Sequence, residues 1–254
     1  MITRPVRRRE VFIERRYRKT RYRYRGPKAA FSFVQERNSV NGTTISATIT
    51  LTPATGNAVV VGIGWASTPG NVTISSVLGV DTWNSAITVN ETASIPGIAI
   101  YYATNVSGVS TTITVTMSGT CNFLDLYASE YSGMLNTSPV DGTNSASGNS
   151  GSASAGSVTP TAGNALVVSL AIAPNVTAAS NAWNLRDTSD GNGWADKLNV
   201  STTAQSTTFT TTTGGWIAAI AAFKSATGGG LLTNIPFTPG DGNPNINTPN
   251  AVSY

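Results

Sequence analysis

The sequence of 254 residues contains no histidine and a single cysteine, Cys121. A chain with this composition cannot build an intrachain disulfide, a zinc site of Cys and His ligands, a Ser-His-Asp triad or a Cys-His pair. Cys121 opens the short run Cys-Asn-Phe-Leu at residues 121–124. This setting predicts a buried structural thiol rather than a reactive one.

Charged residues are scarce outside the first 37 positions. Residues 1–37 hold 13 of the 16 Lys and Arg residues and three of the 12 Asp and Glu residues, so their net charge is +10, and the net charge of the remainder is −6. Only 12 charged residues lie beyond position 37, far fewer than the roughly one in four of ordinary globular domains. Ser, Thr, Asn and Gly supply the polarity instead, which suits a chain packed in an assembly or exposed outside cells.

Long apolar segments are also missing. No segment approaches the roughly 20 apolar residues that span a bilayer, so we expect no membrane partner. The amino terminus lacks the apolar stretch of a secretory signal, and synthesis in a host cytoplasm without a signal peptide is expected.

Short β-branched runs separated by Gly, Pro, Asn and Ser predict an all-β fold from residue 43 onward. Residues 43–51 and 111–117 alternate between apolar and polar side chains, which is typical of half-buried strands. Residues 58–65 and 98–102 are continuously apolar, as expected of strands covered on both faces. A further strand is expected to start at Phe123, and no segment shows a sustained helical period.

The second half of the sequence repeats the first. Residues 53–61 (PATGNAVVV) return as residues 160–168 (PTAGNALVV), and the pair Trp83-Asn84 returns as Trp183-Asn184. The Ala-rich run 216–223 follows two glycines and is interpreted as a buried strand, the counterpart of the run that ends near residue 131. Two copies of a sheet-forming unit, at about 43–133 and 158–226, would press together into an antiparallel two-sheet sandwich. Chance similarity between low-complexity β sequences is the alternative.

Three regions follow from these patterns: a basic arm at 1–37, a β-sandwich domain at 38–227 and a Gly-, Pro- and Asn-rich tail at 228–254. The stretch 142–157, almost entirely Gly, Ser, Ala and Asn, is interpreted as a long connection between the halves, either flexible or held at a sheet edge. Deleting residues 1–37 is expected to leave the domain folded.

The arm interleaves arginine with aromatic residues. Closely spaced guanidinium groups repel one another, so the arm is expected to fold only against a target, for which nucleic acid and an acidic protein surface are both open. The residues expected to bind this partner are Arg4, Arg7, Arg8, Arg9, Arg15, Arg16, Arg18, Lys19, Arg21, Arg23, Arg25 and Lys28, with aromatic contacts from Phe12, Tyr17, Tyr22 and Tyr24.

Two acidic patterns bear on catalysis and metal binding. Asp125 and Glu130 are five residues apart, so a regular strand directs them to opposite faces, which disfavours a glycosidase pair. Residues 187–196 cluster Asp187, Asp190 and Asp196 in a Gly-rich loop that could hold Ca²⁺, although the loop lacks EF-hand spacing and a hydrated turn is the simpler interpretation. No other cofactor is expected.

The tryptophans are the remaining candidates for ligand contact. Trp65, Trp83, Trp183 and Trp216 lie in apolar or repeated contexts and are expected in the core. Trp194, among Gly and Asp residues, is the one candidate for stacking on a sugar.

The overall layout resembles that of viral capsid proteins with a single jelly roll, such as circovirus-like shells, in which an Arg-rich arm precedes antiparallel β-structure. The motifs at 130–133 (EYSG), 138–142 (SPVDG) and 159–168 resemble β-sandwich modules of bacterial surface proteins and of bacteriophage virion proteins, over roughly residues 43–226. This resemblance implies a jelly-roll-like sandwich in an exterior or virion setting and carries over no catalytic residue.

The sequence therefore predicts a non-enzymatic virion structural protein, a capsid or capsid-decoration subunit that contacts other virion subunits, with a homo-oligomer expected. Two alternatives stay open. One is a glycan-binding or adhesion module that uses loops such as 187–196. The other is a small-virus capsid protein whose arm packages nucleic acid directly.

Overall fold

The computed structural model describes residues 30–180 and 182–226. These residues form sixteen β-strands and one short 3₁₀ turn, and all strand pairs are antiparallel. The predicted all-β, antiparallel sandwich is confirmed. No helix in the described ranges is long and apolar enough to cross a membrane.

The first eight strands form one unit. Their bounds are β1 (Ser32–Ser39), β2 (Thr44–Leu51), β3 (Ala58–Ala66), β4 (Ile74–Leu78), β5 (Asn84–Val89), β6 (Gly97–Ala103), β7 (Thr111–Cys121) and β8 (Phe123–Ser132). They make a five-stranded sheet in the order β1-β8-β3-β6-β5, here called sheet I, and a three-stranded sheet in the order β2-β7-β4. This arrangement has the strand order of an eight-stranded jelly roll.

The second eight strands repeat this order. Their bounds are β9 (Val140–Ala153), β10 (Ser157–Val158), β11 (Ala165–Ile172), β12 (Ala178–Ala179), β13 (Asn184–Asp187), β14 (Gly193–Val200), β15 (Gln205–Ser206) and β16 (Phe209–Phe223), with the 3₁₀ turn η1 (Ser189–Gly191) before β14. The six-stranded sheet here called sheet II contains the order β9-β16-β11-β14-β13, which matches sheet I, and the short strand β12 also pairs with the start of β16. β10 pairs with β15 as β2 pairs with β7. Each sequence repeat therefore occupies the same place in its own sheet.

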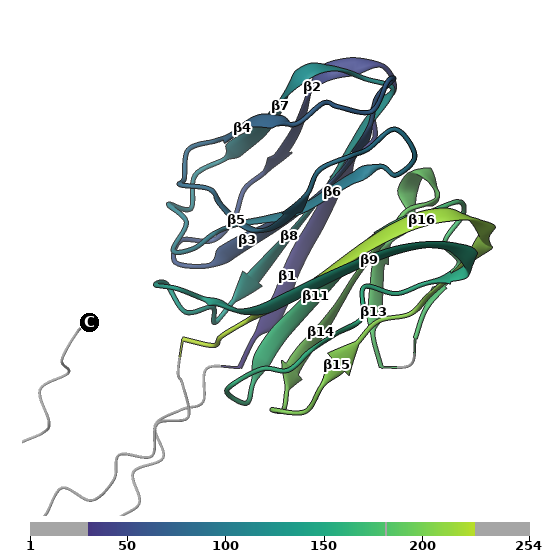
Figure 1. The fold of residues 1–254 in the computed structure, drawn as a ribbon. Coiled ribbons are helices and arrows are strands. Elements are labelled where there is room, and N and C mark those ends of the chain that lie inside the picture. Colours follow the sequence, from purple (N-terminus) through teal and green to yellow (C-terminus); the bar gives the residue numbers. More distant parts are fainter. Residues whose placement is uncertain (1–29, 181, 227–254) are drawn as a thin grey trace, which may run out of the picture.

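Sheets I and II face each other in the middle of the molecule, and each unit adds an outer layer (Figure 1). One apolar core lies between sheet I and the β2-β7-β4 sheet, a second between sheets I and II, and a third on the outer face of sheet II. The sequence predicted only the central core. The structure adds the outer two, because each repeat carries both a large sheet and its own cover.

The continuous apolar runs of β3 and β11 follow from this layering. Both strands lie at the centre of a sheet that is covered on both faces, and all eight residues of β11 are buried. Gly62 and Gly64 of β3 let the two sheets approach closely. A Cβ atom at Gly62 would lie 3.0 Å from the Trp194 ring, and one at Gly64 would lie 2.1 Å from Ile172.

The stretch interpreted as a connection between the halves is largely a strand. β9 runs for 14 residues along the edge of sheet II and pairs with β16 over almost its whole length. Its Gly and Ser residues hide the strand from pattern analysis, since they carry no apolar alternation. One glycine is required by packing: a Cβ atom at Gly148 would lie 2.6 Å from the Trp216 ring. Of the two possibilities, the edge position is the correct one.

The predicted boundary of the arm at residue 37 is also too late. Residues 32–37 belong to β1, the edge strand of sheet I, which pairs with β8. Both ends of the described chain meet beside Gly133: the Ala226 N–H donates to the Gly133 carbonyl at 2.8 Å, and the Ala30 carbonyl oxygen lies 2.9 Å from the Cβ position of Gly133. The arm and the tail therefore join the folded body at one pole.

Candidate functional site

A row of polar side chains on β8 follows the seam between sheets I and II. Alternate residues of a strand face the same side, and Asp125, Tyr127, Ser129 and Tyr131 all make hydrogen bonds with residues of the second unit. All four are fully buried. The row starts beside Phe123 and ends next to Gly133, where Ala30 and Ala226 meet, so it spans the length of the central sheets.

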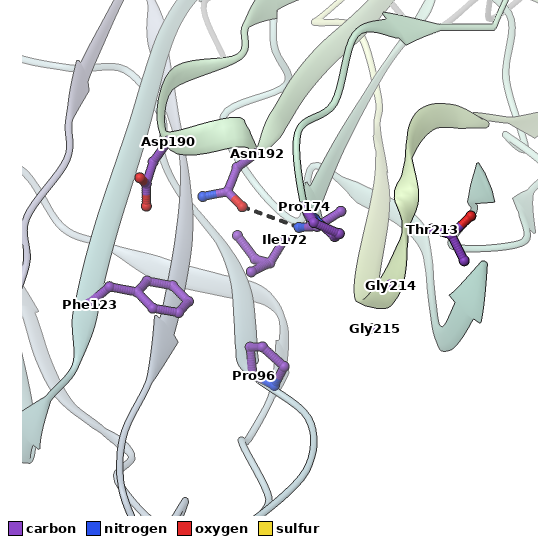
Figure 2. Close-up of a pocket in the computed structure, with 10 residues that line it drawn as sticks. Pro96, Phe123, Ile172, Pro174, Asp190, Asn192, Thr213, Gly214 and Gly215 are labelled. Atoms are coloured by element: carbon purple, nitrogen blue, oxygen red, sulfur yellow. Dashed lines mark hydrogen bonds between the residues drawn. The ribbon is translucent and has the colours of Figure 1, made fainter. Parts of the chain in front are cut away.

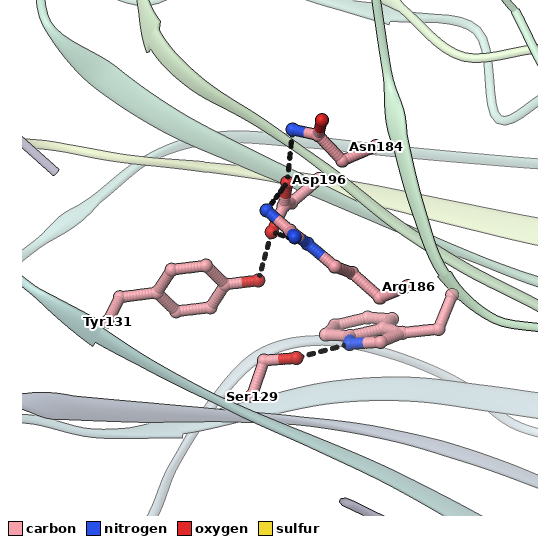
Figure 3. A network of polar contacts seen from close by, with 6 residues as sticks. Ser129, Tyr131, Asn184, Arg186 and Asp196 are labelled. Carbon is pink, nitrogen blue, oxygen red and sulfur yellow. Dashed lines mark hydrogen bonds and ion pairs between the residues drawn. The ribbon is translucent and has the colours of Figure 1, made fainter. Parts of the chain in front are cut away.

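The end of the row near the chain ends contains an ion pair between β13 and β14 (Figure 3). The Arg186 guanidinium donates to both oxygens of the buried Asp196 carboxylate, from Nε to Oδ2 at 2.8 Å and from Nη2 to Oδ1 at 3.0 Å. The Tyr131 hydroxyl and the Asn184 amide also donate to Asp196, each at 2.9 Å. Arg186 lies 3.7 Å from the centre of the Phe33 ring, so the pair binds the two units together.

The middle of the row holds Trp194 and Tyr127. The Trp194 indole N–H donates to Ser129 Oγ at 2.8 Å (Figure 3), and the Tyr127 hydroxyl donates to the Ser189 carbonyl at 2.8 Å. Burial raises the pKa of both Tyr127 and Tyr131. These tyrosines therefore stay neutral and act as hydrogen-bond donors across the seam.

Two pairs of carboxyl groups also meet across the seam. Asp125 of β8 lies beside Asp190 of η1, and burial together with this neighbour raises the pKa of Asp125 to about 7, against the opposing effect of the Asn41 N–H. Glu36 of β1 lies beside Asp187 of β13, and burial and the Asp187 charge raise the pKa of Glu36 to about 7, while Arg37 lowers it. Each pair joins one carboxyl group from each unit.

A groove opens at the end of the seam far from Ala30 and Ala226, and it is here called the distal groove. Its first part, of about 450 Å³, has an apolar lining from Pro96, Phe123, Ile172 and Pro174, and Asp190 stands on its rim (Figure 2). Asn192 fixes one wall, since its Oδ1 accepts the Ala173 N–H at 3.2 Å and its amide donates to Asp125 Oδ2 at 3.1 Å.

A second hollow of about 420 Å³ continues the distal groove along β9 and β16. It shares Pro96 and Gly215 with the first part and is lined further by Ser94, Ile95, Ser147, Gly148, Asn149 and Trp216. Among the residues that line the two parts, Asp190 is the sole charged side chain. An elongated hollow with a partly apolar lining and one exposed carboxylate can hold an extended segment that carries apolar groups and a cation.

The arm residues predicted to bind a polyanion all lie outside the described residues. These are the twelve basic residues from Arg4 to Lys28 and the four aromatic residues Phe12, Tyr17, Tyr22 and Tyr24. What the structure gives is their attachment point, at Ala30 beside Gly133.

The three carboxylates considered for Ca²⁺ have different partners. Asp187 lies beside Glu36, Asp190 lies beside Asp125, and Asp196 is paired with Arg186. Within residues 30–180 and 182–226, no group of three or more Asp, Glu, Cys or His side chains is placed to hold a metal ion.

The tryptophan considered for sugar stacking is inaccessible. Trp194 is fully buried between the sheets, so the prediction of a surface platform at this residue is wrong. The neighbouring glycines suggested exposure, but Gly62 on the facing strand makes room for the ring. Trp65 and Trp183 are buried as predicted, whereas Trp83 and Trp216 are only partly buried, and Trp216 lines the distal groove.

The remaining sequence predictions concern Asp125, Glu130 and Cys121. Asp125 bonds to Asn192 of the second unit, whereas Glu130 bonds to Gln35, Ala54 and Asn57 of the first unit, so the two carboxylates do face opposite sides of β8. Cys121 is buried as predicted, and burial raises the pKa of its thiol to about 11.

Sequence reasoning missed both the polar row and the distal groove. The row had a visible signal, since four successive odd positions from 125 to 131 carry Asp, Tyr, Ser and Tyr in a strand whose even positions are mainly apolar. The groove had none, because its lining comes from six segments that are separate in the sequence. Comparison of the chain with protein-family models, with curated proteins and with solved structures found no match.

Proposed function

We propose that this chain is a non-enzymatic structural subunit of a virus particle, a capsid or capsid-decoration protein of the bacteriophage type. One observation carries the proposal, the separation of charge along the chain. Residues 1–29 hold 12 basic and two acidic residues, a net charge of +10, whereas residues 30–226 hold four basic and nine acidic residues, a net charge of −5. A cationic segment on a weakly charged β-body suits attachment to an acidic capsid surface or to a packaged genome.

The folded body supports this proposal in two ways. Its jelly-roll units have a surface of hydroxyl and amide groups rather than charges, which suits close packing of many copies. The first and last described residues, Ala30 and Ala226, also lie beside Gly133, so attachment through the arm leaves the opposite end of the central sheets free for other contacts.

Removal of the arm tests the proposal, and the structure corrects where the cut must be made. Deleting residues 1–37 would remove most of β1, including Phe33 and its contact with Arg186, so the cut belongs after residue 29. The chain lacking residues 1–29 should keep the thermal stability of the full chain and should lose incorporation into particles. Normal incorporation of the truncated chain, measured by electron cryo-microscopy and protein quantification of purified particles, would refute the proposal.

The same experiment separates the two possible targets of the arm. Direct genome packaging predicts binding of the full chain to DNA or RNA that weakens steeply with salt, because each phosphate contact releases counterions. Anchoring to an acidic protein surface predicts preference for that protein over nucleic acid at physiological ionic strength.

A glycan-binding module is the second candidate, and Trp216 is the observation that favours it. Its partly exposed indole ring lines the distal groove next to Asn149 and Ser147, and aromatic faces beside amide and hydroxyl groups suit sugars. A glycan array tests this candidate, with Trp216→Ala as the variant that should lose binding and Trp83→Ala as the matched control.

A further inference from the structure

We propose that the distal groove binds the basic arm, residues 1–29, of a neighbouring copy of this chain. The inference rests on the proposed function, because it names the partner through which the arm would hold subunits together. The inference gives the arm a binding site on the folded body, which the sequence alone does not identify.

The position of the groove relative to the arm is the first argument. β8 starts at Phe123, which lines the groove, and ends at Ser132, next to Gly133 and to the first and last described residues, Ala30 and Ala226. Ten residues of strand span roughly 30 Å. β14 runs between the same poles, from Asn192 at the groove to Asn199, which bonds to Phe31. The arm is therefore attached at one pole and the groove lies at the other.

This polarity favours a contact between copies. In a head-to-tail arrangement, the arm attachment of one copy lies beside the distal groove of the next, without a reversal of the chain. An arm of 29 residues reaches up to about 100 Å when extended, which is ample for such a crossing. Contacts of this type generate rings or filaments, as shells and their attachments require.

The chemistry of the groove is the second argument. Asp190 is exposed at the rim, and the lining around it is otherwise uncharged and includes two prolines and two aromatic side chains among small and polar residues. The arm offers the complementary groups, because its central part repeats Arg and Tyr from Arg15 to Arg25. A guanidinium would pair with Asp190, and tyrosine rings would pack against Pro96, Phe123 and Pro174.

The carboxyl pair behind the rim supports this assignment. Asp190 lies beside the fully buried Asp125, and neither group has a Lys or Arg among its described hydrogen-bond or ion-pair partners. A cation placed over Asp190 would offset the repulsion between the two carboxylates. The arm is the richest source of cations in this chain.

Cross-linking of full-length chains tests the inference. Thr213 is exposed on the groove wall, and the native Cys121 is buried with a raised pKa, so introduced cysteines react selectively. A Thr20→Cys chain mixed with a Thr213→Cys chain should form a one-to-one cross-linked pair under mild oxidation. Thr50→Cys, exposed on β2 of the outer sheet, is the matched control and should cross-link at least about tenfold more slowly, because effective concentration at a bound site far exceeds that of random encounter.

Two pairs of variants test the role of the groove in the same assay. A Cβ atom at Gly215 or at Gly163 meets open space, so Gly215→Arg should block and repel the arm, whereas Gly163→Arg, outside the groove, should not. Asp190→Asn keeps a residue that tolerates the φ of 54° and should slow cross-linking about threefold to fivefold, whereas Asp81→Asn should leave it unchanged.

Each result bears on one proposal. Equal cross-linking at Thr213 and Thr50, or cross-linking confined to a single chain that carries both Thr20→Cys and Thr213→Cys, would overturn the inference. If the arm is needed for incorporation but fails to cross-link at the groove, the proposed function stands and the inference fails. If it cross-links specifically but is dispensable for incorporation, the inference stands and the proposed function fails.

Discussion

The two jelly-roll units have large sheets with the same order of five strands, but their outer layers differ. In the first unit, the outer sheet has three strands and covers a core with large aliphatic residues such as Ile49, Ile113 and Met117. In the second unit, the cover is reduced to the two-residue strands β10 and β15, and its core is rich in alanine.

This difference shows which part of the fold is constrained by packing between the two units. Sheets I and II keep all five matching strands, because each forms half of the central core and of the polar row. Each outer layer packs only against its own unit, so its sequence and strand lengths can diverge. The outer core of the first unit and the seam should therefore both tolerate change poorly, whereas the outer layer of the second unit should be the most permissive.

The largest expected effect concerns the outer core of the first unit compared with that of the second. Trp65 is fully buried, donates to the Val72 carbonyl at 2.9 Å and packs against Gly97, so Trp65→Ala should lower the free energy of unfolding by about 4 kcal/mol. Trp183→Ala should lower it by about 2 kcal/mol, because this ring is 9% exposed and has a thinner cover. Chemical denaturation measures both losses, and equal losses would contradict the difference between the outer layers.

The seam is tested at Asp196. Asp196→Ala should lower the free energy of unfolding by about 3 kcal/mol, because Arg186, Tyr131 and Asn184 all lose their acceptor. The double variant Arg186→Met with Asp196→Asn removes both charges and should be more stable than the single variant. A double variant that unfolds more easily than Asp196→Ala would show that the ion pair itself, rather than the uncompensated charge, governs stability.

The glycine edge strand of the second unit is tested at Gly148. Gly148→Ala places a methyl group 2.6 Å from the Trp216 ring, and the repacking should cost about 1 to 2 kcal/mol, measured by thermal denaturation. Gly215→Ala is the matched control on β16, because its Cβ atom meets open space. Loss of stability in the control alone would exclude this packing role for Gly148.

The smallest expected effect is the pH dependence of the seam. The pKa values of Glu36 and Asp125 are about 7 in the folded protein, above the 4.5 and 3.8 of the unperturbed groups, so the folded state holds more protons than the unfolded state between about pH 4 and pH 7. Their contribution to stability is present below about pH 4, falls as the pH rises and is lost above pH 7.

Glu36→Gln isolates one of these groups. The variant should match the native chain near pH 4 and be more stable at pH 8 by about 1 kcal/mol, a modest value because Glu36 is partly exposed to solvent. Denaturation at the two pH values measures this difference. A variant that is equally stable or less stable at pH 8 would contradict repulsion between Glu36 and Asp187.

Much of the fold could be predicted from sequence, because burial on one face or on two leaves different patterns. The alternation in residues 43–51 identified β2, and the continuous runs at 58–65 and 165–168 identified the central strands β3 and β11. β9 was not predicted as a strand, because its pairing with β16, rather than a pattern in its own side chains, makes it a strand. Ile45, in phase with the buried face of β2, is 51% exposed, and it lies at a register shift in the pairing of β2 with β7 between Thr44 and Ser46.

The candidate site was harder to predict than the fold. Asp187, Asp190 and Asp196 are close in sequence, but their partners Glu36, Asp125 and Tyr131 come from strands of the other unit. Spacing along one segment cannot reveal such pairings, because they depend on how the two copies face each other. The distal groove is likewise a product of that packing.

The positions of Ala30 and Ala226 beside Gly133 have a consequence for the history of the protein. The first unit ends at this position and the second begins a few residues later, so the junction between the halves lies beside the first and last described residues. A duplicated segment inserted at this position would need only a short linker to connect it to the first unit. Exchanging the order of the halves, by linking Ala226 to Ala30 and opening the chain between Leu135 and Pro139, should therefore yield the same architecture.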